Sequence, residues 1–132
     1  MIFSEKGWAM PSVLMVILVI SLLGTALWYY SMTDVKHVIV QEKAMQAHYL
    51  ARSGAELVAD YAVNNFESLI ARDDYPWISG PYNLEGNAEK HFSVRIDKQA
   101  QRLVIQSTGE VDGVTQTLTL EIDSSNNRYW SR

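Results

Sequence analysis

The hydrophobic pattern divides the chain into two parts. A stretch without a charged residue runs from Trp8 to Thr33, and its centre, Val13–Leu23, is almost purely aliphatic. As an α-helix rising about 1.5 Å per residue, the roughly 23 residues from Trp8 to Tyr30 would extend about 34 Å, which is enough to cross the apolar core of a bilayer. The pattern therefore predicts a membrane-spanning helix over residues 8–33.

From Ala44 the pattern takes the period of an amphipathic helix. Small and apolar residues recur every three or four positions, and polar residues fill much of the opposite face. The predicted buried stripe consists of Ala44, Ala47, Ala51, Gly54, Ala55, Val58, Ala62, Phe66 and Leu69. Small side chains in this stripe would let the helix approach a sheet closely. Because Pro76 cannot continue the helix, we expect one helix that runs on through residues 34–72.

Residues 73–90 are rich in Pro, Gly and Asn, which predicts a loop. The side chains expected to hold this loop against the core are Trp77, Ile78, Tyr82 and Leu84. After the loop the period changes to two, which indicates strands over residues 92–96, 103–108 and 114–122. Residues 97–101 form a predicted polar turn, and Asp112-Gly113 is a strong signal for a tight hairpin.

The predicted fold class is α+β. A long N-terminal helix, with a transmembrane half and an amphipathic half, would pack on a small antiparallel three-stranded sheet within residues 91–123. Three strands packed against a helix are about the minimum for a stable sheet. The remaining residues, 124–132, are predicted to form a polar tail.

The apolar run has three competing interpretations. It resembles a cleaved secretory signal, in which Gly24-Thr25-Ala26 would be the small-residue cleavage site, although the apolar pattern continues past Ala26. It also fits a plain single-pass anchor. In the third interpretation the chain is cut after Gly7 and the whole helix is kept.

The composition of the chain excludes several classes of function. The chain has 132 residues, a net charge of -4 and no cysteine. The negative charge argues against a general affinity for nucleic acid, so none is expected as a direct partner. Without cysteine, disulfides, zinc–thiolate sites and thiol catalysis are excluded.

Catalytic and metal chemistry find little support in the sequence. His37 and His48 would lie about 16 Å apart along one helix, too far to share a metal ion. His91 is the third histidine and stands apart from both.

The Asp73-Asp74 pair and the Asn83–Asn87 loop are a weak candidate for a cation site. Ser107-Thr108-Gly109 fits a strand better than a nucleophile, because no histidine is near it in sequence. We therefore expect no catalytic residue, cofactor or metal, and a protein that is not an enzyme.

The order of these parts resembles the type IV pilin superfamily, which includes prepilins and the pseudopilins of type II secretion. Lys6-Gly7 followed by Trp8 fits a prepilin-type leader over residues 1–7. The segment 46–56, Gln-Ala-His-Tyr-Leu-Ala-Arg-Ser-Gly-Ala-Glu, resembles the helix of PilX-type minor pilins and K-type pseudopilins. The segment 105–114 resembles the strand–turn–strand of the same proteins. Together these likenesses cover nearly the whole chain.

The resemblance implies a processing and assembly route. A prepilin peptidase would cut after Gly7, and methylation would then fall on the new N-terminal residue, Trp8. The chain would wait as a single-pass membrane protein with its C-terminal domain outside the cytoplasm. An inner-membrane assembly platform would then move it from lipid into a cell-surface or periplasmic filament with other pilins or pseudopilins. In this arrangement Glu42, Lys43 and Arg52 are expected to form ion pairs between subunits.

The chain departs from the family pattern at the fifth mature position. Major pilins usually carry Glu there, whereas this chain has Ser12. Several low-abundance subunits also lack that Glu, so the resemblance implies a minor subunit, at the tip or in priming, of a pilus, a pseudopilus or a DNA-uptake filament. The alternative is a single-pass membrane-anchored binding module that does not polymerise.

Overall fold

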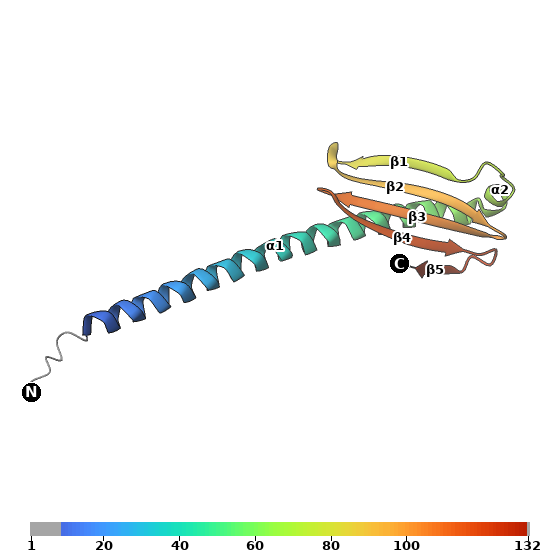
Figure 1. The fold of residues 1–132 in the computed structure, drawn as a ribbon. Helices are drawn as coiled ribbons and strands as arrows, with labels where there is room; N and C mark the ends of the chain where they lie inside the picture. The colour runs from blue at the N-terminus through green and yellow to red at the C-terminus, as the bar shows by residue number, and fades with distance from the viewer. Residues whose placement is uncertain (1–8, 132) are drawn as a thin grey trace, which may run out of the picture. The chain divides into compact units, whose positions relative to one another are not determined.

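The structure, a computed structural model, describes residues 9–131. The chain forms two compact units, the first ending at Ile39 and the second beginning at Val40. One continuous helix, α1 (Ala9–Asn64), belongs to both units (Figure 1).

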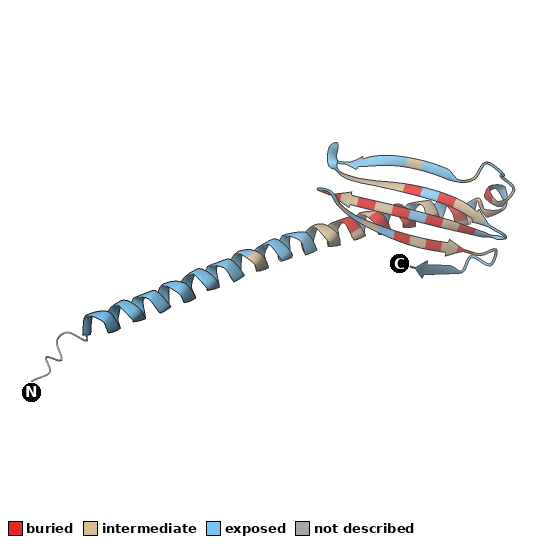
Figure 2. Cartoon of the chain, in the orientation of Figure 1, coloured by how far each residue is buried: buried red, intermediate tan, exposed pale blue. Residues whose placement is uncertain are grey.

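Within the described residues, the first unit consists of helix alone. From Ala9 to Ile39 every residue is exposed except Thr33, which is half-buried (Figure 2). The predicted helix over the apolar run is thus confirmed from Ala9 onward. The leader and the cleavage residues, Gly7 and Trp8, lie outside the described residues.

In the second unit the helix is interrupted before its expected end. α1 stops at Asn64, and a short helix, α2 (Phe66–Ile70), follows. Between them Asn65 leaves the helical conformation, with φ −123° and ψ 26°. Its side-chain amide donates a hydrogen bond to the Tyr61 carbonyl at 3.0 Å, the kind of local bond with which Asn competes against regular helix. The prediction of one unbroken helix to residue 72 is therefore wrong at Asn65.

The sheet has five antiparallel strands in sequential order, not three. The strands are β1 (Trp77–Leu84), β2 (Asn87–Gln99), β3 (Arg102–Val111), β4 (Val114–Ile122) and β5 (Arg128–Ser131). The three predicted strands are confirmed as β2, β3 and β4. The α+β class, with a long N-terminal helix packed on an antiparallel sheet, is confirmed as well.

The first extra strand lies in the segment predicted to be a loop. β1 pairs with β2, and the pairing shifts register between Ser79 and Tyr82, where Gly80 and Pro81 stand. An edge strand tolerates proline at such an irregularity because it needs ladder hydrogen bonds on one side only. The apolar side chains of β1, which were expected to hold this segment against the core, are largely exposed, although the Tyr82 ring packs on Phe92 of β2.

The second extra strand lies in the predicted polar tail. Tyr129 and Trp130 of β5 pair with Glu121 and Leu120 of β4. The chain reverses before β5 through Asp123, whose carboxylate accepts hydrogen bonds from the Ser125 and Asn127 backbone amides at 2.9 and 3.0 Å. Both extra strands sit at the edges of the sheet.

The tight hairpin between β3 and β4 is confirmed. Asp112 and Gly113 both have positive φ, 48° and 81°, as a two-residue turn of this kind requires. The predicted polar turn over residues 97–101 is shorter than expected. β2 runs on to Gln99, and Ala100, with φ 54°, lies in the reversal.

The core lies between the second part of α1 and the sheet. The helix contributes the buried residues Ala47, Ala51, Gly54, Ala55, Ala59 and Ala62. The largest buried side chains of the sheet are Ile96, Leu103, Ile105, Leu120 and Ile122. The predicted small-residue stripe is confirmed in its centre, whereas Ala44, Val58 and Phe66 are only half-buried and Ala59 was not predicted.

Candidate functional site

The apolar part of α1 is the first candidate site. It is long and apolar enough to cross a membrane, and its apolar window has no buried residue. The Thr25 hydroxyl finds its partners inside the helix: it donates to the Ser21 and Leu22 carbonyls at 3.0 and 2.9 Å. A helix that satisfies its own polar groups is the form in which a segment can sit in hydrocarbon. The structure thus supports single-pass membrane anchoring by this helix.

Ser12 lies in the exposed first turns of α1. Pro11 precedes it within the first turn of the described helix, a place where proline is tolerated because the backbone N–H there has no intrahelical partner. The cleavage residues themselves precede the described residues. Of the predicted N-terminal site, only the Ser12 position can therefore be placed.

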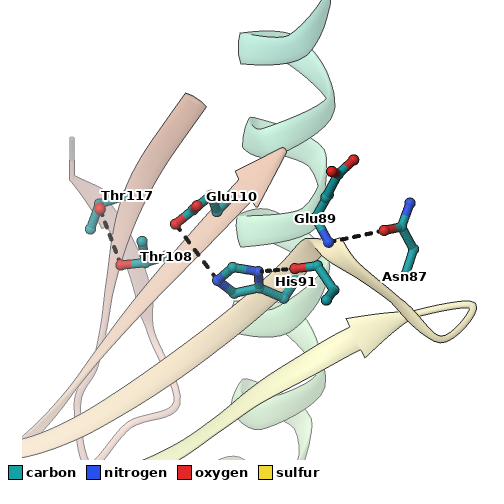
Figure 3. Close-up of polar contacts among 7 residues, drawn as sticks. Asn87, Glu89, His91, Thr108, Glu110 and Thr117 are labelled. Carbon is teal, nitrogen blue, oxygen red and sulfur yellow. Dashed lines mark hydrogen bonds and ion pairs between the residues drawn. The ribbon is translucent and has the colours of Figure 1, made fainter. Parts of the chain in front are cut away.

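A polar cluster surrounds the ends of β2 and β3. Figure 3 shows the His91 ring between two oxygen groups, with Nδ1 3.1 Å from the Ala88 carbonyl and Nε2 3.6 Å from the Glu110 carboxylate. The Asn87 side chain accepts a hydrogen bond from the Glu89 backbone amide at 2.9 Å. These contacts hold the His91 ring in one orientation on an exposed rim of the sheet.

A salt bridge ties the helix to the β3–β4 hairpin. Lys43 Nζ lies 3.2 Å from Asp112 Oδ2, and the Asp112 backbone amide donates to the Glu89 carbonyl at 2.9 Å. The hydrogen bond from Lys43 is the main cause that holds the pKa of Asp112 below its usual value. The pKa of Asp123 is likewise lowered, chiefly by the hydrogen bond from the Asn127 backbone.

Two of the residues expected to pair between subunits have partners in their own chain. Lys43 pairs with Asp112, and Arg52 Nε lies 2.9 Å from Glu56 Oε1, one helical turn away. Glu42 accepts a long hydrogen bond from Gln46 at 3.4 Å. These side chains therefore have partners within the chain itself.

The three histidines are not brought together. His37 and His48 lie on α1 and His91 lies on β2; the His48 ring makes an edge contact with Tyr49, with centroids 6.0 Å apart. Within residues 9–131 no group of His, Asp and Glu has the arrangement of a metal site.

The residues considered as a weak candidate for a cation site do not lie together in the structure either. Asp73 and Asp74 precede β1, whereas Asn83 lies near the other end of that strand and Asn87 begins β2. Asp73 is almost fully exposed, and its carboxylate is 3.8 Å from Lys98 Nζ.

Ser107 is buried in β3 under Gly54, and its hydroxyl has no hydrogen-bond partner among the described residues. Thr108 shares a hydrogen bond with Thr117 across the strands at 3.1 Å (Figure 3). Ser107 and Thr108 both lie in strand β3, as expected. Ser107 is closed off from solvent, which does not suit a nucleophile that must meet a substrate.

The structure contains an apolar groove that the sequence analysis did not identify. It has a volume of about 380 Å³ and lies between α1 and the β1–β2 edge of the sheet. Leu57 and Tyr61 of α1 face it from one side, and Trp77 and Tyr82 of β1 from the other. The available signal was the spacing of aromatic residues within residues 77–82, which the prolines and glycines of that segment obscured.

Comparison of the chain with known protein families, with characterised proteins and with solved structures finds no match.

Proposed function

We propose that the protein is a non-enzymatic minor subunit, acting at the tip or in priming, of a type IV pilus, a type II secretion pseudopilus or a DNA-uptake filament. The observation that carries the proposal is that the two parts of α1 have different surroundings. Its apolar first part is exposed throughout, and its second part packs on a small sheet. A helix of this kind needs lipid or other helices around its first part, because so large an apolar surface is not left in water.

In the proposed mechanism the helix has two successive environments. The segment Val13–Leu27 first contacts lipid and later contacts the same segment of neighbouring subunits. This exchange changes hydrophobic free energy little, because lipid tails are as apolar as the side chains. Packing and polar pairing would therefore decide the order of assembly. The partners are a prepilin peptidase, an inner-membrane assembly platform, membrane lipid and other pilins or pseudopilins.

Ser12 supports a minor rather than a main role. In the related filaments a Glu at this position is thought to pair with the N-terminal ammonium of a neighbour inside the apolar bundle. A charge in such a medium is tolerated only when it is paired. A serine hydroxyl carries no charge, so this subunit cannot supply the carboxylate of such an ion pair. Its place would then be where that pairing is not required, such as the end of the filament.

The decisive experiment measures the mass of the mature chain. The full chain is co-expressed with a prepilin peptidase, and its intact mass is compared with that of a Gly7→Arg variant. We expect the wild-type chain to lose residues 1–7 and to gain a methyl group on Trp8, while the variant keeps its leader. A wild-type chain that keeps its first seven residues would contradict the proposal.

The second candidate is a membrane-anchored binding module that keeps its leader and does not polymerise. The apolar groove between α1 and β1 favours it, because such grooves occur on proteins that bind partners. The same mass measurement separates the two functions. A secreted protein would instead begin at Leu27, which N-terminal sequencing would reveal.

A further inference from the structure

β5 covers only part of the outer edge of β4. Its residues pair with Thr119–Ile122, and among residues 9–131 no strand pairs with Val114–Leu118 on that side. Figure 1 shows β5 beside the second half of β4 only. The first half, Val114–Leu118, is therefore an open edge about 17 Å long.

The backbone groups of Thr115 and Thr117 point out of the open edge. A two-residue turn such as the one between β3 and β4 closes on a hydrogen-bonded pair, here Val111 and Val114. Along an antiparallel pair of strands, hydrogen-bonded and non-hydrogen-bonded residues alternate. Thr115 and Thr117 therefore turn their N–H and C=O groups away from β3. The Thr117 hydroxyl lies 3.1 Å from the Thr108 hydroxyl, which fits the closer side chains of a non-hydrogen-bonded pair (Figure 3).

The open edge lacks the features that usually keep strand edges from pairing. Proteins protect such edges with proline, charged residues, bulges or short strands. At the opposite edge of the sheet, β1 has Pro81 beside a shift of register. β5 is only four residues long and begins with Arg128. The open edge reads Val-Thr-Gln-Thr-Leu, with no charge and no proline, and it keeps an unbroken register with β3. It is therefore well suited to pairing with a further strand.

Two hollows lie beside the open edge, between β4 and α1. The larger has a volume of about 380 Å³, and Met45 and Tyr49 of α1, exposed by 60% and 63%, border it. The smaller, of about 290 Å³, lies beside Trp130 of β5. His48 of α1 and Leu118 of β4 line both hollows, so the two adjoin. A strand on the open edge would run alongside them.

The pairing of β5 indicates which side chains of an added strand would enter the hollows. Trp130 lies opposite Leu120, and its ring lies under the Arg52 guanidinium of α1, 5.7 Å from the ring centroid. Side chains along a strand alternate between the two faces of the sheet. Residues opposite Gln116 and Leu118 would therefore also point towards α1. An occupant of the open edge would have apolar residues at these alternate positions.

We propose that the open edge binds an extended peptide segment of a partner protein, which pairs antiparallel with β4 and continues the line of β5. Outward N–H and C=O groups at strand spacing are matched one for one by another strand, so the occupant is a peptide backbone. Its apolar side chains enter the two hollows, and the residues between them face solvent. This binding goes beyond the proposed function, because it needs neither a membrane nor leader cleavage.

A set of synthetic peptides is the probe for this edge. The peptides are short, capped at both ends and fluorescently labelled, and they alternate threonine with an apolar residue, which is Val, Ile, Leu, Phe, Tyr or Trp in turn. They are added to the full chain in detergent micelles, and fluorescence anisotropy measures binding. We expect saturable binding of at least one peptide. N-methylation of the peptide amides that face β4 should abolish it, because those amides can then no longer donate.

Thr117→Pro separates strand pairing from general adhesion to the chain or the micelle. It removes an outward N–H of the open edge, and an edge strand tolerates proline where the N–H does not bond within the sheet. We expect it to weaken peptide binding by about tenfold, which is the worth of a backbone hydrogen bond. Thr117→Val is the matched control, since it keeps the N–H and should bind peptide as the wild type does. Circular dichroism verifies that both variants keep the sheet.

Hydrogen exchange locates the bound peptide without any substitution. When a binding peptide is added to the wild-type chain, the amides of Thr115 and Thr117 should exchange more slowly. The amides of β1, at the opposite edge of the sheet, should be unchanged. Nuclear magnetic resonance of the chain in micelles measures both rates.

Three results would overturn the proposal. The first is that no peptide of the set binds at millimolar concentration. The second is that bound peptide leaves the exchange of Thr115 and Thr117 unchanged. The third is that folded Thr117→Pro binds peptide as well as Thr117→Val does. The leader-cleavage experiment measures the mass of the chain and is independent of all three, so failure of this binding leaves the proposed function standing.

Discussion

The Gly109 backbone of β3 packs directly against the Ala47 carbonyl group of α1. A Cβ atom on Gly109 would collide with that carbonyl oxygen and would lie 2.8 Å from the Ala51 backbone nitrogen. Backbone atoms cannot move aside as a flexible side chain can. We therefore expect Gly109→Ala to destabilise the sheet domain by about 3 kcal/mol, as overpacking of a tight contact does. Chemical unfolding of the full chain in detergent micelles, followed by tryptophan fluorescence, measures the change.

Gly24→Ala is the matched control for this prediction. Gly24 lies in the exposed part of α1, and an added Cβ would meet nothing within 4 Å. Because alanine favours helix over glycine, the stability of the sheet domain should stay unchanged or nearly so. Equal losses for Gly109→Ala and Gly24→Ala would show that the helix does not press on β3.

The Lys43–Asp112 salt bridge should make the sheet domain sensitive to acid. The pKa of Asp112 is below its usual value in the folded chain, so this group stabilises the fold above the unfolded pKa of about 4. The contribution is lost as the pH falls through the lower, folded pKa. Asp112→Asn should therefore lower the melting temperature at pH 7, and this effect should shrink as the pH falls below about 4.

A double-mutant cycle tests whether Lys43 causes the effect. In a Lys43→Met background, the pH-dependent effect of Asp112→Asn on the melting temperature should largely disappear, because the main partner of the carboxylate is gone. A difference that persists without Lys43 would assign the acid sensitivity to other groups.

Ser107 offers a prediction of the opposite sign. Its hydroxyl is buried without a hydrogen-bond partner among residues 9–131. Removal of an unsatisfied buried polar group is neutral or favourable, so Ser107→Ala should change stability by between zero and about 1 kcal/mol, towards greater stability. Ser107→Val would instead add a methyl group in the closely packed region beside Gly54 and should cost about 1–3 kcal/mol. The same unfolding measurement tests both substitutions. A loss of stability for Ser107→Ala would mean that the hydroxyl has a hydrogen-bond partner in solution.

The elements that could be predicted from sequence are those specified by local pattern. The stripe from Ala47 to Ala62 repeats with the helix period, and Asp112-Gly113 supplies the positive φ of a tight turn. What could not be predicted depends on partners distant in sequence. β1 contains Gly80 and Pro81, which locally favour a loop, and only its pairing with β2 makes it a strand.

The candidate site shows the same limit. The apolar run is recognisable from composition alone. The groove is not, because it exists only where β1 comes to lie beside Leu57 and Tyr61 of α1. Likewise nothing near Lys43 in sequence indicates that its partner is Asp112, which the hairpin brings to the helix.

The membrane role of α1 can be tested with charged substitutions. Ile17→Arg combined with Ile20→Arg places two charges in the middle of the apolar run, each costing about 3 kcal/mol of membrane insertion. We expect much of the doubly substituted chain to leave the membrane fraction. Leu57→Arg with Tyr61→Arg, at exposed positions of the second unit, is the matched control and should remain membrane-bound. Equal partitioning of the two variants would contradict anchoring by the apolar run.

The proposed minor role makes a prediction for Ser12→Glu. If the subunit occupies the end of a filament, a carboxylate at this position gives it the charge that main subunits carry, and its incorporation along the filament should increase. The fold should not change, because Ser12 lies in the first unit, far in sequence from the residues of the core. Quantitative immunoblotting of sheared filaments measures incorporation, and the melting temperature of the purified chain reports the fold. Ser12→Gln is the control, since it has the size of Glu without the charge and should leave incorporation at the wild-type level. Unchanged incorporation of Ser12→Glu would indicate that the missing carboxylate does not set the position of this subunit.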